Sequence, residues 1–488
     1  MKKPEIISMV VWAAFIVVFW TILMEHALTL KEPLYPFKPF VDYARYVIAP
    51  WGLTFLVFAC AYVVGDLVVG SRIPAGGMRD VYIEGIGLGV AAVATFIIGL
   101  VGLLYTAVFL VEAATLLAVG WRRLYELWKR IAASSRRIGK WRIEEIVMIG
   151  LMVWYVYHTM GIACNPSVGW DTGNSHLAAP KWYLREHAIH FQPWINFNNF
   201  PQLVEMLGMY VMAGVGDPGA TVAYMFLIGQ CFLIYGLVQD RQAGLLAVLV
   251  WLSMPFATRY SQEMYVEMAL AFYCILALYG LVIYKRWDLA GLAAGCALSV
   301  KYTAAPFVII LAIFAGRKGW WKFLLWTIPI AAAWYLRNIV LFGNPVFPFM
   351  DTWARVPGFS GTVEPTVRAG LIVDHAAMLR NFRLPWQEML FDPKKGPMIW
   401  WTTMTEREPW VRSGRPASTG PWLLALLPVL AIAMKKRVYW GVGGVVLGYM
   451  GYWILVERIW DSRYLVPIWP IMCVIVGWGF REIRRWFK

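Results

Sequence analysis

The chain has 488 residues, of which 60% are hydrophobic and 15% are charged, and its mean hydropathy is +0.59. A soluble protein of this length needs far more polar surface, so the composition excludes a soluble class and predicts that most of the chain faces lipid. Lysine and arginine outnumber aspartate and glutamate by 44 to 29. These basic residues do not form a soluble basic domain with interleaved aromatic residues, and we therefore expect no nucleic-acid partner.

Apolar segments recur from one end of the chain to the other. A helix needs roughly 20 apolar residues to cross the roughly 30 Å of bilayer hydrocarbon. We therefore predict an all-α polytopic membrane protein with about fourteen transmembrane helices. The expected spans are 6–24, 47–69, 83–101, 103–121, 143–161, 219–238, 242–256, 266–284, 288–301, 303–316, 323–341, 420–434, 438–456 and 463–480.

The basic residues gather at one set of ends of these spans. They include Lys2, Lys3, Arg72, Arg79, the run from Arg122 to Arg142, Arg241, Lys285, Arg286, Arg317, Lys318, Lys435, Lys436, Arg437 and the tail from Arg481. Such residues favour the cytoplasmic side of a membrane. We therefore expect both termini to be cytoplasmic.

Four expected spans precede a strongly basic segment, 122–142, in which arginine and lysine recur at helical spacing. We interpret 1–121 as an N-terminal four-helix membrane module and 122–142 as a basic helix lying at the cytoplasmic interface. The main membrane core is then 143–480, and 481–488 is a basic cytoplasmic tail.

Two long stretches, 162–200 and 342–419, are expected to form loops on the outer side, where long loops over a rigid scaffold commonly carry function. We expect 201–215 to be a helix lying in the outer interface. Asp66 and Glu112 are acids within the first four spans, and acids in a membrane are candidates for function. Because no motif surrounds these two, we favour packing or an interhelical hydrogen bond.

Carboxylates occur at two places that the expected topology brings to the outer face. Asp171 lies in GWDTGNSH, just after an expected span, and Glu263 and Glu267 lie in SQEMYVEMALAFY. Transfer of a sugar to a hydroxyl group needs a base for the hydroxyl proton and often a metal ion for the departing phosphate. Asp171 suits either role. The alternatives are a solvated loop aspartate and, for the two glutamates, stabilisation of a helix N-terminus.

Three cations are expected at the same depth as these acids. Lys301 interrupts the apolar stretch ALSVKYTAAP, Arg337 lies near the outer end of a span, and Arg463 lies in DSRYLVPIWP. Three cations on one face beside acids indicate a phosphate or pyrophosphate clamp, with snorkelling to lipid headgroups as the alternative. The first outer loop also holds three histidines, and their spacing matches no strong metal signature. We expect substrate or interface roles for His176, His187 and His190.

Five segments of the chain resemble, in order, elements of the integral-membrane GT-C glycosyltransferases. They are WDTGNSHLAAPKWYLREHAI, YVEMALAFYCILALYGL, GLAAGCALSVKYTAAP, WYLRNIVLFGNPVFPF and RYLVPIWPIMCVIVGWG. Within that superfamily, 143–480 looks most like the bacterial relatives of dolichyl-phosphate-mannose protein mannosyltransferases and like aminoarabinose transferases. The resemblance implies an inverting sugar transfer at the outer face of the inner membrane of a prokaryote.

The resemblance implies that Asp171 is the catalytic base or the ligand of a divalent cation, magnesium or manganese, and that Glu267 is its acidic partner. It implies substrate-binding roles for polar residues of the same segments, namely His176, Glu263, Lys301, Tyr302, Arg337, Asn338, Asn344, Arg463 and Tyr464. The chain departs from the family where the second acid is glutamate instead of aspartate. Its first outer loop follows the fifth expected span instead of the first, so the first four spans look like an added module.

The sequence therefore favours a glycosyltransferase that moves a sugar from a polyprenyl-phosphate-linked donor to an envelope lipid, glycan or protein. Its expected partners are that donor, the acceptor, membrane lipids, and a membrane protein bound through the first four spans. Two alternatives stay open. One is a flippase or transporter of lipid-linked glycans, which would line a midplane cavity with charges, and the other is a catalytically inactive membrane scaffold.

Overall fold

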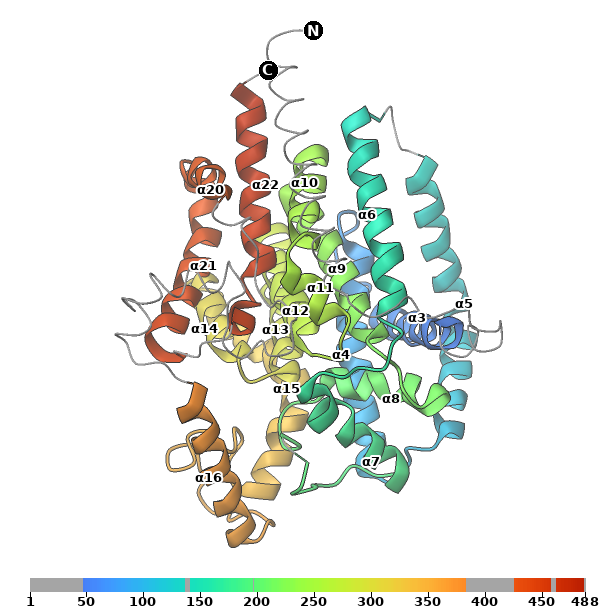
Figure 1. Ribbon diagram of the computed structural model, residues 1–488, viewed down its shortest axis with the longest axis vertical. Coiled ribbons are helices and arrows are strands. Elements are labelled where there is room, and N and C mark those ends of the chain that lie inside the picture. Colours follow the sequence, from blue (N-terminus) through green and yellow to red (C-terminus); the bar gives the residue numbers. More distant parts are fainter. Residues whose placement is uncertain (1–46, 137–140, 196, 383–424, 458–461, 487–488) are drawn as a thin grey trace.

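The computed structural model describes residues 47–136, 141–195, 197–382, 425–457 and 462–486, and every regular element among them is a helix (Figure 1). The prediction of an all-helical, membrane-embedded protein is confirmed at this level. The expected span 6–24 and the part of the second outer loop from 383 to 419 lie outside the described residues.

Seven of the described helical segments are long and apolar enough to cross a membrane. They are α3 (Ala49–Val69), α4 (Arg79–Leu100), α6 (Ile143–Ile162), α9 (Thr221–Val238), the segment Glu267–Tyr284 that begins with α12 (Glu267–Tyr279), α15 (Trp320–Phe342), and the segment Arg437–Glu457 that contains α21 (Trp440–Tyr452). An eighth crossing results if α10 (Arg241–Leu252) and α11 (Pro255–Ser261), which are bent by 67°, form one broken span. The number of fourteen spans stays a prediction.

Three expected spans are shorter in the structure than a straight crossing requires. The spans 288–301 and 303–316 correspond to α13 (Trp287–Val300) and α14 (Ala304–Phe314), which have 14 and 11 residues, and 242–256 corresponds to the 12 residues of α10. At about 1.5 Å per residue, α13 covers only about 21 Å of the roughly 30 Å of hydrocarbon. The break between α13 and α14 falls at Lys301, whose backbone is extended. A lysine is thereby placed where two apolar helices end.

Helix α5 (Thr106–Arg136) is a continuous helix of 31 residues that includes most of the expected span 103–121 and most of the basic segment after it. Its basic half is tied to α3 and α4 by ion pairs. Arg123 Nε lies 3.0 Å from Asp66 Oδ2, and an Arg130 guanidinium nitrogen lies 2.9 Å from Asp80 Oδ1. Asp66 therefore joins helices, as the packing interpretation predicts.

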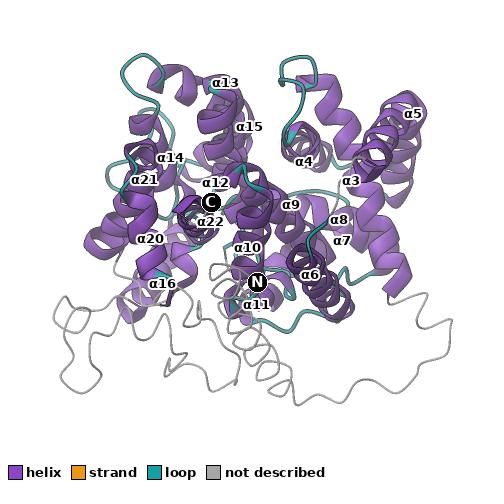
Figure 2. Ribbon diagram, turned by 90° about the horizontal axis from the view of Figure 1, so that it is seen from above, coloured by secondary structure: helices purple, strands orange, loops and turns teal. Residues whose placement is uncertain are grey.

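Helix α12 is the most deeply placed element of the central group, because every residue from Glu267 to Tyr279 is buried. Helices α9 and α13 pack against it. Figure 2 shows α9, α10, α12 and α22 (Trp469–Trp486) between α3, α4 and α5 on one side and α14, α20 (Leu427–Met434) and α21 on the other. The first residue of this helix is Glu267, so an acid is buried at its N-terminal end.

The first outer loop, 162–200, contains α7 (Ala178–Glu186), and the expected helix 201–215 corresponds to α8 (Leu203–Val215). Helix α8 is buried against α3, α4 and α7, and Leu203, Val204 and Leu207 have no exposed surface. The prediction of a helix at 201–215 is confirmed, and protein covers this helix on several sides, while its place in the outer interface stays a prediction. A helix that is apolar on nearly all sides is best stabilised by packing on several sides.

Several helix termini that carry basic residues expected on the cytoplasmic side lie at the same end of the molecule. In Figure 1 the starts of α6 and α10 and the end of α22 lie at the upper end, whereas α7 and α16 (Pro365–Phe382), from the two outer loops, lie at the lower end. At the upper end Arg241 pairs with Glu145 at 2.6 Å, and Arg484 pairs with Asp240 at 2.7 Å. This two-ended arrangement agrees with the sidedness of the sequence, while the particular membrane and the topology stay predictions.

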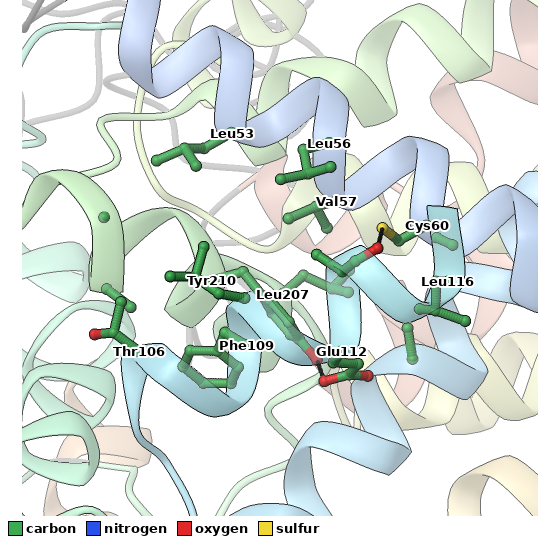
Figure 3. A pocket seen from close by; sticks show the side chains of 16 residues that line it. Leu53, Leu56, Val57, Cys60, Thr106, Phe109, Glu112, Leu116, Leu207 and Tyr210 are labelled. Atoms are coloured by element: carbon green, nitrogen blue, oxygen red, sulfur yellow. Dashed lines mark hydrogen bonds between the residues drawn. The ribbon is translucent and has the colours of Figure 1, made fainter. Parts of the chain in front are cut away.

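An apolar cavity of about 70 Å³ lies between α3, α5 and α8 (Figure 3). Glu112 lines it and accepts a hydrogen bond of 2.5 Å from the Tyr210 hydroxyl group of α8. The Thr95 hydroxyl group of α4 donates to that same hydroxyl oxygen at 3.2 Å. Glu112 therefore connects helices by hydrogen bonds, as expected, and the cavity is separate from the residues singled out for chemistry.

Candidate functional site

Two acid–cation pairs lie where the first outer loop meets the central helices. Asp171, just before the π-helical turn η2 (Thr172–His176), pairs with Arg463 in the turn Ser462–Leu465 that precedes α22. Lys301 donates a hydrogen bond of 2.8 Å to Glu267 at the start of α12. Four residues that the sequence singles out, drawn from four distant segments, are thus brought together in two pairs.

The two pairs belong to one cluster, with Tyr464 between the cations. Lys301 Nζ lies 5.5 Å from the centre of the Tyr464 ring, and the Arg463 guanidinium carbon lies 5.4 Å from it. Each cation acts electrostatically on both Asp171 and Glu267. The Glu267 side chain is 1% exposed and the other three side chains are 17–21% exposed, so their charges interact more strongly than they would in water.

Asp171 is an ionised carboxylate in partly buried surroundings. Burial alone would raise the pKa of Asp171, because it disfavours the charged form. The positive charges of Arg463, Lys301 and His176 outweigh burial, and the pKa of Asp171 lies below its ordinary value. The interpretation of Asp171 as a fully solvated loop residue is therefore wrong.

His176 adds a third basic group to the cluster, and its partner is an acid that the sequence did not single out. His176 Nδ1 lies 2.5 Å from Glu205 Oε1 on α8, and the Glu205 side chain is 4% exposed. Burial would lower the pKa of His176, but the hydrogen bond that His176 donates to Glu205 and the negative charges of Glu205, Asp171 and Glu267 raise this pKa above its ordinary value. The signal in the sequence was an isolated acid in the otherwise apolar segment PQLVEMLGMYVMAGV.

Glu263 serves the backbone around the cluster. Its Oε2 atom accepts hydrogen bonds of 3.0 Å from the backbone N–H groups of Val168 and Gly169. The hydroxyl group of Ser167 accepts another from the Met264 N–H at 2.9 Å. These bonds hold the segment before Asp171 against the segment before α12, so Glu263 fixes the positions of the two acids relative to each other.

Arg337, the third cation of the expected clamp, lies in a separate buried group. It donates to the backbone oxygen of Asn198 at 2.9 Å and to Asn198 Oδ1 at 3.0 Å. Asn338 donates to the backbone oxygen of Asn199 at 2.9 Å and to the Tyr302 hydroxyl oxygen at 2.6 Å. The structure therefore does not join Arg337 to the acids, and these side chains fasten the first outer loop to α15.

Asn344 has a similar fastening role in the loop after α15. Its side chain accepts from the Val346 N–H at 2.9 Å and donates to the backbone oxygen of Phe349 at 3.0 Å. The Tyr302 hydroxyl group lies 3.4 Å from the backbone oxygen of Phe347 in the same loop. Tyr302 follows Lys301 directly, so this group adjoins the charged cluster through the chain itself.

The residues of the cluster do not fit a divalent cation in their present arrangement. Magnesium and manganese take carboxylate oxygens as ligands, but Asp171 is paired with Arg463, and Glu267 with Lys301. Across the described ranges, no group of three or more histidine, cysteine, aspartate and glutamate residues is placed to hold a metal ion. The predicted role of Asp171 as a metal ligand stays a prediction.

Two carboxylate oxygens of this cluster are buried without a hydrogen bond from the described part of the chain. They are Oε2 of Glu267 and Oε2 of Glu205, and both atoms are buried. An unsatisfied buried acceptor costs about 1–3 kcal/mol, and more when the group is charged. A proton on the carboxyl group, or a hydroxyl group placed beside it, would satisfy such an oxygen.

Comparison with known protein families, curated proteins and solved structures finds no match to this chain. The chemistry of the site therefore rests on the geometry of its own residues, and the likeness to the GT-C glycosyltransferases stays an expectation drawn from the five segments.

Proposed function

We propose that the protein is an inverting glycosyltransferase that moves a sugar from a polyprenyl-phosphate-linked donor to a hydroxyl-bearing lipid, glycan or protein of the cell envelope. The observation that carries this proposal is the cluster in which Asp171 pairs with Arg463 and Glu267 pairs with Lys301. The reaction needs a base for the acceptor and cations for the leaving phosphate. The cluster supplies both in one partly buried place.

The arrangement links the two halves of the reaction. Asp171 or Glu267 takes the proton of the acceptor hydroxyl group, whose oxygen forms a bond to the anomeric carbon of the sugar. The bond from that carbon to the phosphate oxygen breaks, and its electron pair leaves with the phosphate. When a carboxylate takes up the proton, its partner cation loses its counter-charge. Arg463 or Lys301 then becomes available to the phosphate as negative charge develops there.

The remaining expectations belong to the same proposal. The donor reaches the site from the membrane, the site faces the outer side of a prokaryotic inner membrane, and the first four spans bind a membrane-protein partner. A need for magnesium or manganese is expected from the resemblance alone, and no step above depends on it.

The proposal is tested first at Asp171. Asp171→Asn keeps the size of the side chain but removes its charge and most of its basicity. We expect sugar transfer by the purified variant in lipid nanodiscs to fall by about 10²–10⁴-fold, the usual contribution of a general base. Stability should fall as well, by about 1.5–3 kcal/mol, because a hydrogen bond between charged groups is lost. Glu267→Gln should give a comparable loss of transfer, and Glu263→Gln a milder one.

Exchanging the two charged residues of a pair distinguishes a role in catalysis from a role in folding. Asp171→Arg combined with Arg463→Asp restores an ion pair, so a thermal melt should recover, while transfer stays lost because the base and the cation have changed places. Recovery of transfer together with stability would show that the pair is only structural. Normal transfer by Asp171→Asn would overturn the proposal and favour the flippase or the scaffold, and movement of a lipid-linked sugar across vesicles distinguishes those two.

A further inference from the structure

Glu205 and His176 form a third charged pair beside the pairs of Asp171 and Glu267. Glu205 is the third residue of α8, where the positive end of the helix dipole stabilises a carboxylate. Its Oε1 atom engages His176 Nδ1, so Nε2 is the nitrogen of the imidazole ring left for a substrate. A carboxylate on one ring nitrogen fixes the tautomer and the orientation of a histidine, as it does in catalytic triads.

The charges around His176 favour its protonated form. The acids that act on it come from three elements: Glu205 on α8, Asp171 before η2, and Glu267 on α12. The centre of the Tyr265 ring lies 6.3 Å from the centre of the His176 ring. The permanent cations of the cluster are Lys301 and Arg463, so three carboxylates face two cations. One proton on His176 makes the cluster neutral.

We infer that Glu205 is a positioning residue that holds His176 as an imidazolium ion, and that His176 is the general acid that donates the Nε2 proton to the departing phosphate. This inference rests on the proposed function, because it names the proton donor of that same site. It assigns a separate task to each half of the cluster: the carboxylate pairs receive the acceptor proton, and the histidine pair supplies one to the leaving group.

The protons balance over one turnover. The acceptor oxygen gives its proton to Asp171 or Glu267 and bonds to the anomeric carbon. The phosphate leaves with the electron pair of the broken carbon–oxygen bond and takes the Nε2 proton of His176. The carboxyl group then returns its proton to the imidazole ring, so the products are the glycosylated acceptor and a protonated polyprenyl phosphate.

The charge state of His176 can be measured without any reaction. The chain has six histidines, so protein labelled with ¹⁵N only in histidine gives few signals, and His176→Gln identifies one of them. In Glu205→Gln the titration of that signal should move to lower pH, because a negative partner is lost. The control is Glu482→Gln, a carboxylate on α22 with the same 4% exposure that accepts from Tyr439 instead. The control should leave the signal unchanged.

The pH profile of sugar transfer tests the role in catalysis. Because the protonated form is the active one, transfer should fall as the pH rises through the pKa of His176. Glu205→Gln should shift this alkaline decline to lower pH, and His176→Gln should lower transfer at least tenfold and abolish the decline. A merely structural role would lower the rate without moving the profile.

Each result decides between the two proposals. The inference is overturned if the titration of the His176 signal does not move in Glu205→Gln, or if both variants have the same pH profile of sugar transfer as the wild type. In either case, sugar transfer by the wild type still upholds the proposed function. A wild type with no sugar transfer overturns the function and the catalytic role together. The titration then still reports whether Glu205 sets the charge of His176.

Discussion

Lys301 carries its charge into the space between two short apolar helices, with a side chain that is 19% exposed. Glu267, which is 1% exposed, supplies the opposite charge 2.8 Å away. Neither charge is stable alone in such surroundings, because removing one member of a buried pair leaves an uncompensated charge. The same dependence makes the pair sensitive to any event that neutralises one partner.

The first prediction at this scale concerns the pair itself. Lys301→Ala should destabilise the protein by about 3–5 kcal/mol and weaken use of the lipid-phosphate donor. Lys301→Met combined with Glu267→Gln should regain most of that stability, since neither charge is left alone, but should not regain transfer. Thermal melts and donor-dependent rates for the two single variants and the double variant form a double-mutant cycle. Full transfer by the double variant would mean that the pair serves folding only.

Most charged residues of the cluster can be predicted from the sequence because they stand out from apolar neighbours, but Glu205 cannot. Asp171, Glu267, Lys301 and Arg463 interrupt or follow apolar stretches, and the structure joins them. Glu205 lay in a helix predicted to lie in the outer interface of the membrane, where an acid can face water. Only the packing of α8 shows that this carboxylate is buried. The partner of a charge depends on tertiary contacts that spacing along one segment does not contain.

At the scale of elements, the position of Lys301 depends on how α13 packs on α15. Gly291 and Gly295 lie four residues apart on α13, and a methyl group at either would meet the backbone oxygen of Phe323 or Thr327 on α15. Small residues at this spacing let membrane helices approach closely. Since Lys301 directly follows α13, that close approach sets the depth and direction of its charge.

This packing yields a second prediction. Gly295→Ala should destabilise the protein by about 1–3 kcal/mol, the cost of overpacking a tight contact, and should lower sugar transfer because α13 moves. Gly150→Ala is the matched control, since no heavy atom lies within 4 Å of the added methyl group on α6. It should be neutral or stabilising by up to about 1 kcal/mol. A melting temperature that is the same in both variants would show that α13 and α15 can separate without cost.

At the scale of the whole molecule, composition was enough to predict the class of fold, and the lengths of the helices were harder to predict. The segments around α13, α14 and α10 are apolar enough to suggest crossings. The helices are nevertheless short, because α13 ends before Lys301, α14 begins after it, and α10 ends before Pro255. The hydropathy of a segment predicts that its surroundings are apolar, but it does not predict where the helix begins and ends. A short helix packed among other helices has a hydropathy as high as that of a transmembrane helix, because its protein neighbours are as apolar as lipid.

The topology gives a third prediction. Ser71, between α3 and α4, and Ser360, between α15 and α16, are both exposed, and the distribution of basic residues places them on opposite sides of the membrane. In a variant without native cysteines, Ser360→Cys should react with an impermeant maleimide in intact spheroplasts, and Ser71→Cys should react only after permeabilisation. Reaction of Ser71→Cys in intact spheroplasts would reverse or refute the topology.

The shortness of α14 has a consequence for how the bilayer meets the protein. Where a helix with an exposed apolar side is shorter than the hydrocarbon is thick, the bilayer beside it thins so that lipid headgroups sink toward its end. We expect such a dip beside α14, which exposes Ile309 and Ile313 and begins just after Lys301. A phosphate that drifts sideways in its leaflet would then descend to the charges along the sloping lipid surface. The sugar would arrive by lateral diffusion, and its carrier would never have to leave the membrane.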